Sequence, residues 1–174
     1  SSPTIANCLI VGNHATDAAG GVVYCANSNA VFVNCTLADN CEGQSGAGLY
    51  LLDSRVIVVN SILWDNGPSE IVSVGLDGPC VSYSDIKGGW EGPGCFYADP
   101  LFAGAGDYHL QSQSGRWDPK TQMWAQDRAT SLCIDAGDPS GPVGAEPSPN
   151  GSVINMGVYG GTTEAAKSFV EGGR

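Results

Sequence analysis

The sequence predicts an all-β fold, a right-handed parallel β-helix (solenoid) with coils of about 26 residues and an irregular C-terminal cap. Three observations predict it: short strips recur with one period, apolar residues alternate with polar ones, and 25 glycines among many Asn and Ser residues mark frequent turns. Helix signals are nearly absent. A left-handed β-helix would show a hexapeptide period, which the sequence lacks.

The repeat is visible in two strips that recur in phase. Residues 7–13 (NCLIVGN) return as 34–40 (NCTLADN) and again as 60–66 (NSILWDN), at steps of 27 and 26 residues. Residues 20–24 (GGVVY) match 46–50 (GAGLY), again 26 apart. A leucine-rich repeat has a similar period but needs different leucine spacing. Two strand-like runs in each repeat therefore favour the β-helix.

Alternation within each repeat predicts which side chains face the core. Side chains of one parity share a face of a strand, so one parity should point inward throughout each strip. Stacked coils would then place Cys8 beside Cys35 in one inward ladder. The residues assigned to the inward face are Ala6, Cys8 and Ile10, then Val31, Val33, Cys35 and Leu37, then Ile57, Val59, Ser61 and Leu63.

Three asparagines end the recurring strip at the same point of successive coils. Asn13, Asn40 and Asn66 are predicted to form a structural ladder whose amides hydrogen-bond from coil to coil. Asn also tolerates the left-handed backbone that a sharp corner needs. The alternative interpretation is a polar row that binds a ligand.

The repeat divides the chain into two parts of one domain. Residues 1–87 are predicted to be β-helix coils, and 88–174 the final coil or coils, an inserted loop and a C-terminal cap. A repeat array needs such an atypical end to cover its last open edge. The chain also begins inside a repeat, so we expect it to continue an upstream β-helix of a larger protein.

Composition restricts the partners. The net charge of −11 would repel nucleic acid on average, and the short apolar runs are too short for a membrane span. Few lysines among many Gly, Asn, Ser and Thr residues are typical of a secreted or cell-surface protein. Seven cysteines permit either a disulfide framework or free thiols packed in the core. We expect free thiols at Cys8 and Cys35, and consider a Cys80–Cys95 bridge the alternative near the cap.

Several motifs in the second half carry a family resemblance. They are residues 83–90 (YSDIKGGW), 98–102 (ADPLF), 107–110 (DYHL), 133–139 (CIDAGDP) and 155–161 (NMGVYGG). Together they resemble the C-terminal portion of right-handed parallel β-helix proteins secreted by environmental bacteria, which have the pectate-lyase-like fold. That fold also serves polygalacturonases, alginate-modifying enzymes, phage tailspikes and surface proteins, so the resemblance implies an architecture and no particular activity.

Two aspartates are the best candidates for catalysis. Asp39 and Asp65 occupy matching positions of adjacent coils, so their carboxylates would lie about 5 Å apart at strand spacing. That separation suits a retaining glycosidase, and two such charges could also bind calcium. The alternative is two solvated turn residues, because Gly12 stands in the first coil. We predict no catalytic residue and no cofactor, with calcium at these aspartates as the exception.

One aromatic residue suggests ligand binding. Trp64 has outward parity beside Asp65, where an indole could stack on a sugar ring. The sequence therefore predicts a non-catalytic extracellular segment of a surface or secreted protein, with weak binding to a polysaccharide or cell-surface glycan. The alternative is a fragment of a polysaccharide lyase or glycoside hydrolase whose site lies mostly in upstream coils.

Overall fold

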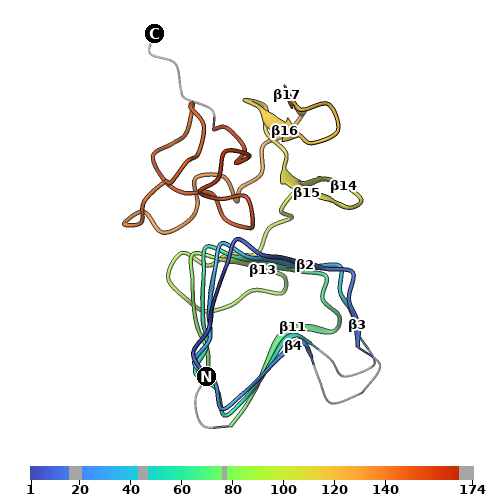
Figure 1. Cartoon of the computed structure of the whole chain (residues 1–174), viewed down its shortest axis with the longest axis vertical. Helices are drawn as coiled ribbons and strands as arrows, with labels where there is room; N and C mark the ends of the chain where they lie inside the picture. Colours follow the sequence, from blue (N-terminus) through green and yellow to red (C-terminus); the bar gives the residue numbers. More distant parts are fainter. Residues whose placement is uncertain (16–20, 43–46, 76–77, 169–174) are drawn as a thin grey trace.

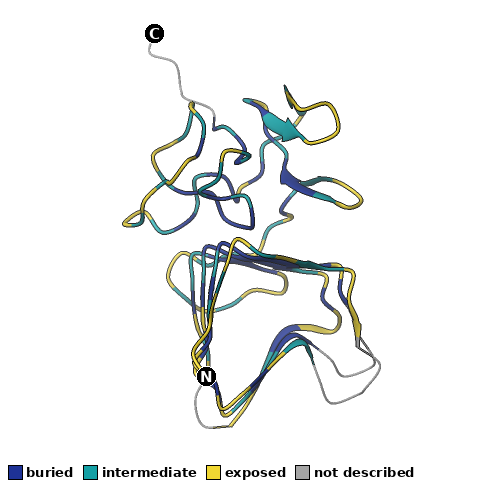
Figure 2. Ribbon diagram, viewed as in Figure 1, coloured by how far each residue is buried: buried dark blue, intermediate teal, exposed yellow. Residues whose placement is uncertain are grey.

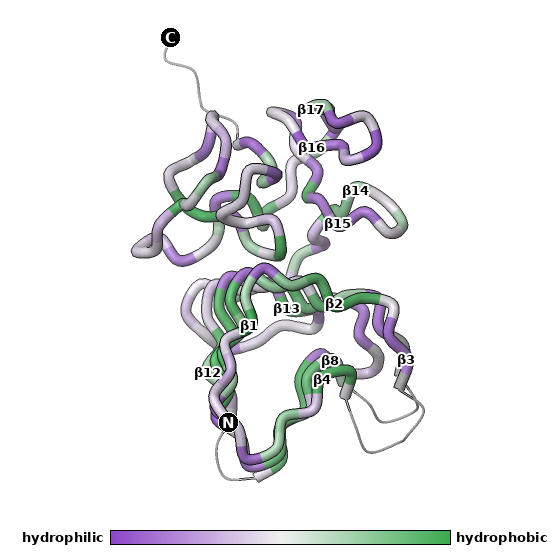
Figure 3. Tube along the Cα trace, viewed as in Figure 1, coloured by the Kyte–Doolittle hydropathy of each residue, from purple (hydrophilic) through white to green (hydrophobic). Residues whose placement is uncertain are grey.

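The computed structural model describes residues 1–15, 21–42, 47–75 and 78–168. These residues form an all-β fold without helices, in which parallel strands build stacked sheets (Figure 1). Each of four successive passes of the chain adds one strand to the first sheet and one to the second. Three of these passes also add a strand to the third sheet. Hydrophobic residues concentrate on these strands (Figure 3).

Every strand of the stack pairs in parallel with its equivalent in the next pass. The first sheet contains β1 (Thr4–Ala6), β5 (Val31–Val33), β9 (Ile57–Val59) and β12 (Cys80–Ser82). The second contains β2 (Leu9–Val11), β6 (Thr36–Ala38), β10 (Ile62–Trp64) and β13 (Asp85–Ile86). The third contains β4 (Gly21–Ala26), β8 (Ala47–Leu52) and β11 (Ser69–Val74), and β3 (His14–Ala15) pairs with β7 (Cys41–Glu42).

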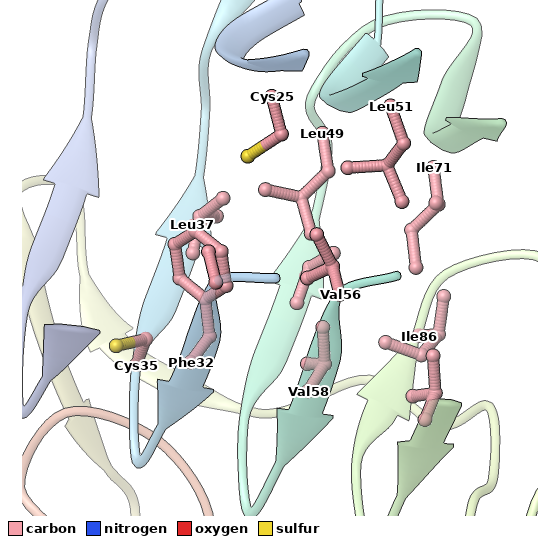
Figure 4. Close-up of a cluster of buried hydrophobic side chains, with 13 residues drawn as sticks. Cys25, Phe32, Cys35, Leu37, Leu49, Leu51, Val56, Val58, Ile71 and Ile86 are labelled. Carbon is pink, nitrogen blue, oxygen red and sulfur yellow. The ribbon is translucent and has the colours of Figure 1, made fainter. Parts of the chain in front are cut away.

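The core lies inside these passes and is made of columns of like side chains. Leu37 stacks on Ile10 and Leu63, and Leu49 pairs with Val23 and Ile71 across the third sheet. Leu37, Leu49 and Leu63 are fully buried, each contributing about 2–3 kcal/mol through removal of apolar surface from water. Figure 4 shows part of this cluster between the sheets.

The predicted inward parity is wrong for the first sheet. Phe32 and Val58 are buried in the core, whereas Val31 and Val33 are only half-buried and Ile57 is 43% exposed. The reason is a corner between the first and second sheets. Asn7, Asn34 and Asn60 take a left-handed backbone there, with φ of 47°, 48° and 51°, and this conformation reverses which parity points inward. Ala6 and Val59 accordingly face outward, beside the inward Ile5 and Val58.

The second corner also differs from the prediction. The left-handed residues are Gly12, Asp39 and Asp65, with φ of 64°, 52° and 57°, rather than the asparagines that follow them. Because the corner is made one residue earlier, the amide of Asn40 turns into the stack, where Asn40 is buried. Its Nδ2 donates to the carbonyl of Ile10 at 2.8 Å.

The last open edge is covered by a short segment, residues 88–96, and not by the whole C-terminal half. Trp90 packs against the main core, and Phe96 pairs with Asp85 on the free edge of β13. The Phe96 amide donates to the Ser84 carbonyl at 3.2 Å. This segment therefore performs the covering role that the sequence analysis assigned to residues 88–174.

The remaining residues, 97–168, pack against the outer face of the second sheet (Figure 1). They contain two antiparallel hairpins, β14 (Phe102–Gly104) with β15 (Asp107–Leu110), and β16 (Arg116–Asp118) with β17 (Met123–Ala125). Ile62 on the outer side of β10 is fully buried beneath this C-terminal segment. Figure 2 shows buried residues along the second sheet, where the segment covers it. Strands β6 and β10 of the second sheet are therefore covered on both faces, which explains why Thr36 and Ala38 are buried although they point away from the main core.

Asparagines of the first corner attach this C-terminal segment to the stack. Asn7 Nδ2 donates to the carbonyls of Val158 and Gly160, both at 2.9 Å. Asn34 Nδ2 donates to the Asn155 carbonyl at 2.9 Å, and Asn60 Oδ1 accepts the Asp138 amide at 2.7 Å. The row thus connects three passes to one loop.

A buried carboxyl provides a further attachment. Asp85 on β13 is fully buried and accepts the Ala98 amide and the Cys133 thiol, each at 3.2 Å. Burial raises the pKa of Asp85 to about 6, and the two hydrogen bonds only partly offset that effect. Asp85 therefore joins the stack to the C-terminal segment at an electrostatic cost near neutral pH.

The cysteines with described side chains are all free thiols. Cys8 and Cys35 lie next to each other on adjacent passes and both pack in the core. Burial raises the pKa of the Cys35 thiol, which keeps it protonated and unreactive. Cys80 is exposed on β12, whereas Cys95 packs against the core, so the two thiols are unbridged.

Candidate ligand-binding hollow

A hollow opens at the second corner, where the third and fourth passes differ from the first two. Only three residues, 67–69, separate Asn66 from Glu70, and the fourth pass leaves the stack through Gly88 and Gly89. Two adjoining spaces of about 240 and 200 Å³ result. We call them together the Glu70 hollow. The residues that line both are Pro68, Ser69, Glu70, Lys87 and Gly88.

Glu70 ends the row of asparagines. Asn13 Nδ2 donates to Asn40 Oδ1 at 3.0 Å, and Asn40 Nδ2 donates to Asn66 Oδ1 at 2.6 Å. Asn66 in turn donates from Nδ2 to Glu70 Oε2 at 2.6 Å and from its backbone N to Oε1 at 3.2 Å. The structure thus brings together the three asparagines named in the sequence analysis and adds a carboxylate to them.

The protonation of Glu70 is shifted by its surroundings. Burial raises the pKa of this carboxyl, while the hydrogen bonds from Asn66 act in the opposite direction. The charge of Asp65 raises the pKa further and that of Lys87 lowers it. The hollow therefore contains a buried carboxyl group whose pKa lies above its ordinary value.

An ion pair and an aromatic pair flank the hollow. Lys87 Nζ donates to Asp65 Oδ1, and this hydrogen bond raises the pKa of Lys87. The same ammonium lies 5.9 Å from the ring centroid of Trp64. Trp64 also packs against Tyr97, with 5.5 Å between ring centroids and 41° between ring planes. Tyr97 lines the hollow and is 57% exposed.

The two candidate aspartates have different partners. Asp65 pairs with Lys87, whereas Asp39 Oδ2 accepts a hydrogen bond from Tyr108 Oη at 2.8 Å. Burial, followed by the interaction with Asp39, raises the pKa of Tyr108 to about 12, so the phenol remains a donor. Both aspartates also take the left-handed corner conformation that Gly12 takes in the first pass. The recurrence of Asp at this position is therefore explained by the left-handed backbone of the corner, which Asp tolerates.

This arrangement suits the binding of a polar ligand with an apolar face. The Trp64–Tyr97 pair offers aromatic surface, and Lys87, Asp65 and Ser69 offer hydrogen-bonding groups beside it. Glu70 is the one carboxylate among the residues that line the hollow, and both of its oxygens accept hydrogen bonds from Asn66.

Sequence reasoning identified Trp64 and Asp65 but missed Glu70, Lys87 and Tyr97. Glu70 had a signal, because the third repeat has fewer residues than the earlier ones between its asparagine, Asn66, and its strand of the third sheet. Lys87 had a weaker one as the basic residue that ends the fourth pass. Tyr97 had none, since its place depends on the path of the segment after β13.

A second polar cluster lies in the C-terminal segment. His109 is buried, with Nδ1 2.6 Å from Asp107 Oδ1 and Nε2 3.2 Å from Glu164 Oε2. Its ring stacks on Tyr159 at 3.6 Å between centroids. The cluster connects β15 to the segment around Glu164. Because the imidazole is buried, the cluster offers no open reaction site.

Within the described ranges, no three His, Cys, Asp or Glu side chains converge in a way that could hold a metal ion. The described residues also contain no helix long and apolar enough to cross a membrane.

The fold and the hollow thus define an all-β protein of stacked parallel sheets with a polar cleft flanked by aromatic residues. A family model described as "Disaggregatase related" matches residues 80–137, about a third of the chain. The matched stretch runs from β12 through both hairpins and includes Lys87 and Tyr97 of the hollow. No curated protein and no solved structure matches the chain.

Proposed function

We propose that this chain is a right-handed parallel β-helix segment of a larger secreted or cell-surface protein, and that it binds glycan at the Glu70 hollow without catalysing a reaction. The parallel pairing of equivalent strands in successive passes supports the β-helix. The clockwise course from β2 through β3 to β4, with the first pass nearest the viewer, supports right-handed winding (Figure 1). An upstream continuation would pair with the open edges of β1, β2 and β4.

The observation that carries the binding proposal is the aromatic pair beside the hollow. Sugar rings present an apolar face to aromatic side chains and hydroxyl groups to polar ones. Trp64 and Tyr97 supply the first kind of surface, and the Lys87–Asp65 pair supplies donors and acceptors at its edge. The hollow is shallow and partly exposed, which suits weak binding to a chain of sugars.

The same geometry favours binding over hydrolysis. Glycoside hydrolysis ordinarily uses two carboxyl groups, one as acid and one as base or nucleophile. Glu70 has both oxygens engaged by Asn66, Asp65 is paired with Lys87, and Asp39 is held by Tyr108. Each carboxylate near the hollow therefore already has a partner.

A carbohydrate-active enzyme remains the second candidate function, and two observations favour it. The family model that matches residues 80–137 is described as "Disaggregatase related", which is the name of an enzyme. Glu70 is moreover a buried carboxyl with a raised pKa beside an open hollow, as a general acid would be. On this alternative Glu70, rather than Asp39 or Asp65, would be the group to test.

Binding and turnover should be measured on a panel of neutral and acidic polysaccharides, with and without calcium. We expect retention of wild-type protein by at least one polysaccharide, and about a tenfold weaker affinity for Trp64→Ala and Tyr97→Ala, since one stacking contact is worth roughly 1–2 kcal/mol. Tyr24→Ala is the matched control, because Tyr24 is 52% exposed on β4, away from the hollow.

Equal loss in the Tyr24 control, or no retention by any polysaccharide, would refute glycan binding at this site. Product release by wild-type protein that disappears in Glu70→Gln would replace the binding function with the enzymatic one.

A further inference from the structure

Residues 126–168 contain no strand or helix, and one buried glutamate organises much of this segment. Glu146 is 8% exposed, and its Oε1 accepts the backbone amides of Asn155 and Gly161, both at 2.8 Å. Asn155 extends the network: its Oδ1 accepts the Asp135 amide at 2.8 Å, and its Nδ2 donates to the Ala166 carbonyl at 2.8 Å. Glu146 thus joins two turns of one loop, 9 and 15 residues further along the chain.

The other oxygen of the same carboxyl group has no partner. Of the buried side-chain nitrogen and oxygen atoms in the described ranges, Glu146 Oε2 is the one without a hydrogen bond. A buried polar atom left unpaired costs roughly 1–3 kcal/mol, and more when it carries charge.

The charged group that acts on the Glu146 carboxyl is another carboxylate, so it does not offset the cost of burying a negative charge. Burial raises the pKa of Glu146, and the carboxylate of Asp135 raises it further. Asp135 is itself held near the loop, since its Oδ1 accepts the Gly151 amide at 3.1 Å. A Cβ at Gly151 would clash with the Asp135 carboxylate, so a larger residue there would displace that side chain.

Three basic side chains have partners other than Glu146. Arg116 pairs with Asp127 at 3.1 Å, Lys87 with Asp65, and the Lys167 ammonium lies 4.1 Å from the ring centroid of Trp124. Asp135 and Glu146 are thus both held by Asn155, and the charged group that acts on Glu146 is the Asp135 carboxylate and not a cation.

We propose that Glu146 and Asp135 bind a calcium ion that fastens the loop of residues 135–161. Two carboxylates match the charge of a divalent cation, and calcium accepts oxygen ligands in irregular geometry, including main-chain carbonyls, amide oxygens and water. No imidazole or thiolate joins the pair among the described residues, which disfavours zinc. The site is separate from the Glu70 hollow and from the Asp39–Asp65 position.

The ion would further stabilise a segment that contains no strand or helix. Calcium that binds only the folded chain raises the unfolding temperature by mass action. The effect should be visible in the intact protein, because the loop contacts three passes of the stack through Asn7, Asn34 and Asn60.

The test is calorimetric titration of the chelator-treated full chain with calcium chloride, together with thermal unfolding. We expect one calcium ion per chain and a rise in Tm of roughly 5–10 °C at a calcium concentration a hundred times the Kd. Glu146→Gln should abolish both. Glu91→Gln, which changes an exposed glutamate in the short covering segment, should keep both, and so should Asp65→Asn.

Asp135→Asn serves as the second variant if Glu146→Gln does not fold, and it should weaken calcium binding at least tenfold. The proposal is overturned if calcium gives wild-type protein neither heat nor a Tm shift, which would indicate a water molecule at Glu146 Oε2. It is also overturned if both loop variants keep the wild-type response.

Discussion

Replacing Asn40 by alanine tests whether the asparagine row supports the stack. The Asn40 side chain is buried, with Oδ1 accepting from Asn13 N at 2.9 Å and from Asn13 Nδ2 at 3.0 Å. Its Nδ2 donates to Ile10 O at 2.8 Å and to Asn66 Oδ1 at 2.6 Å. Alanine would leave two acceptors without this donor in a low-dielectric place. At roughly 1–2 kcal/mol for each, plus the space vacated, we expect a loss of about 3–5 kcal/mol.

The matched control is Asn13→Ala, because Asn13 belongs to the same row but is exposed at its first position. We expect it to lose less than about 1 kcal/mol. Urea unfolding followed by tryptophan fluorescence would give both values, provided that the slope with denaturant stays the same. Equal losses in the two variants, or a loss below about 1 kcal/mol for Asn40→Ala, would show that the buried amides are dispensable and refute this reasoning.

Three further predictions concern other parts of the molecule. The raised pKa of Asp85 favours folding with that carboxyl protonated, so its contribution is complete below about pH 4 and is lost as pH rises through about 6. Wild-type protein should therefore lose about 2 kcal/mol from this group between pH 4 and 7, and Asp85→Asn should not; parallel pH profiles in denaturant unfolding would contradict this. Cys80 is the exposed thiol among those described, so a thiol reagent followed by peptide mapping should modify it first; earlier modification of Cys133 would count against the packing. Gly160→Ala should cost roughly 1–3 kcal/mol, because a Cβ there would lie 2.0 Å from the Asn155 carbonyl oxygen; an unchanged Tm would mean that the loop shifts freely.

The period of the sequence was sufficient to predict the stacked strands and which positions of successive repeats lie side by side. The matching of Leu37 with Ile10 and Leu63 follows from sequence spacing alone, because parallel stacking places equivalent residues next to each other. The inward parity failed at the first corner. Asn34 was counted as part of one continuous strand, but its left-handed backbone ends β5 and starts a new alternation in β6.

The position of residues 97–168 could not be predicted from periodicity, because these residues do not repeat. A terminal segment can cover either the end or the side of a stack, and both bury apolar surface. One signal did exist. Ile62 and Trp64 are large apolar residues on the outer face of β10, and such residues in a sheet indicate that a second layer covers it. The place of Tyr97 at the hollow was beyond reach for the same reason, since it depends on the path after β13.

The asparagines of the first corner have a consequence for how the chain folds. In a repeat array each unit touches only its neighbours, so the ends can open independently and the stack can grow one repeat at a time. Here Asn7 reaches Val158 and Gly160, which are 151 and 153 positions away, and Asn34 reaches Asn155 across 121. Closing such distant pairs is slow, because the entropy of a long loop is lost before any contact forms. Once closed, they prevent the first pass from fraying without releasing the C-terminal loop. We therefore expect amide hydrogens of β2 and of residues 155–160 to exchange with solvent at a common rate, as parts of one cooperative unit.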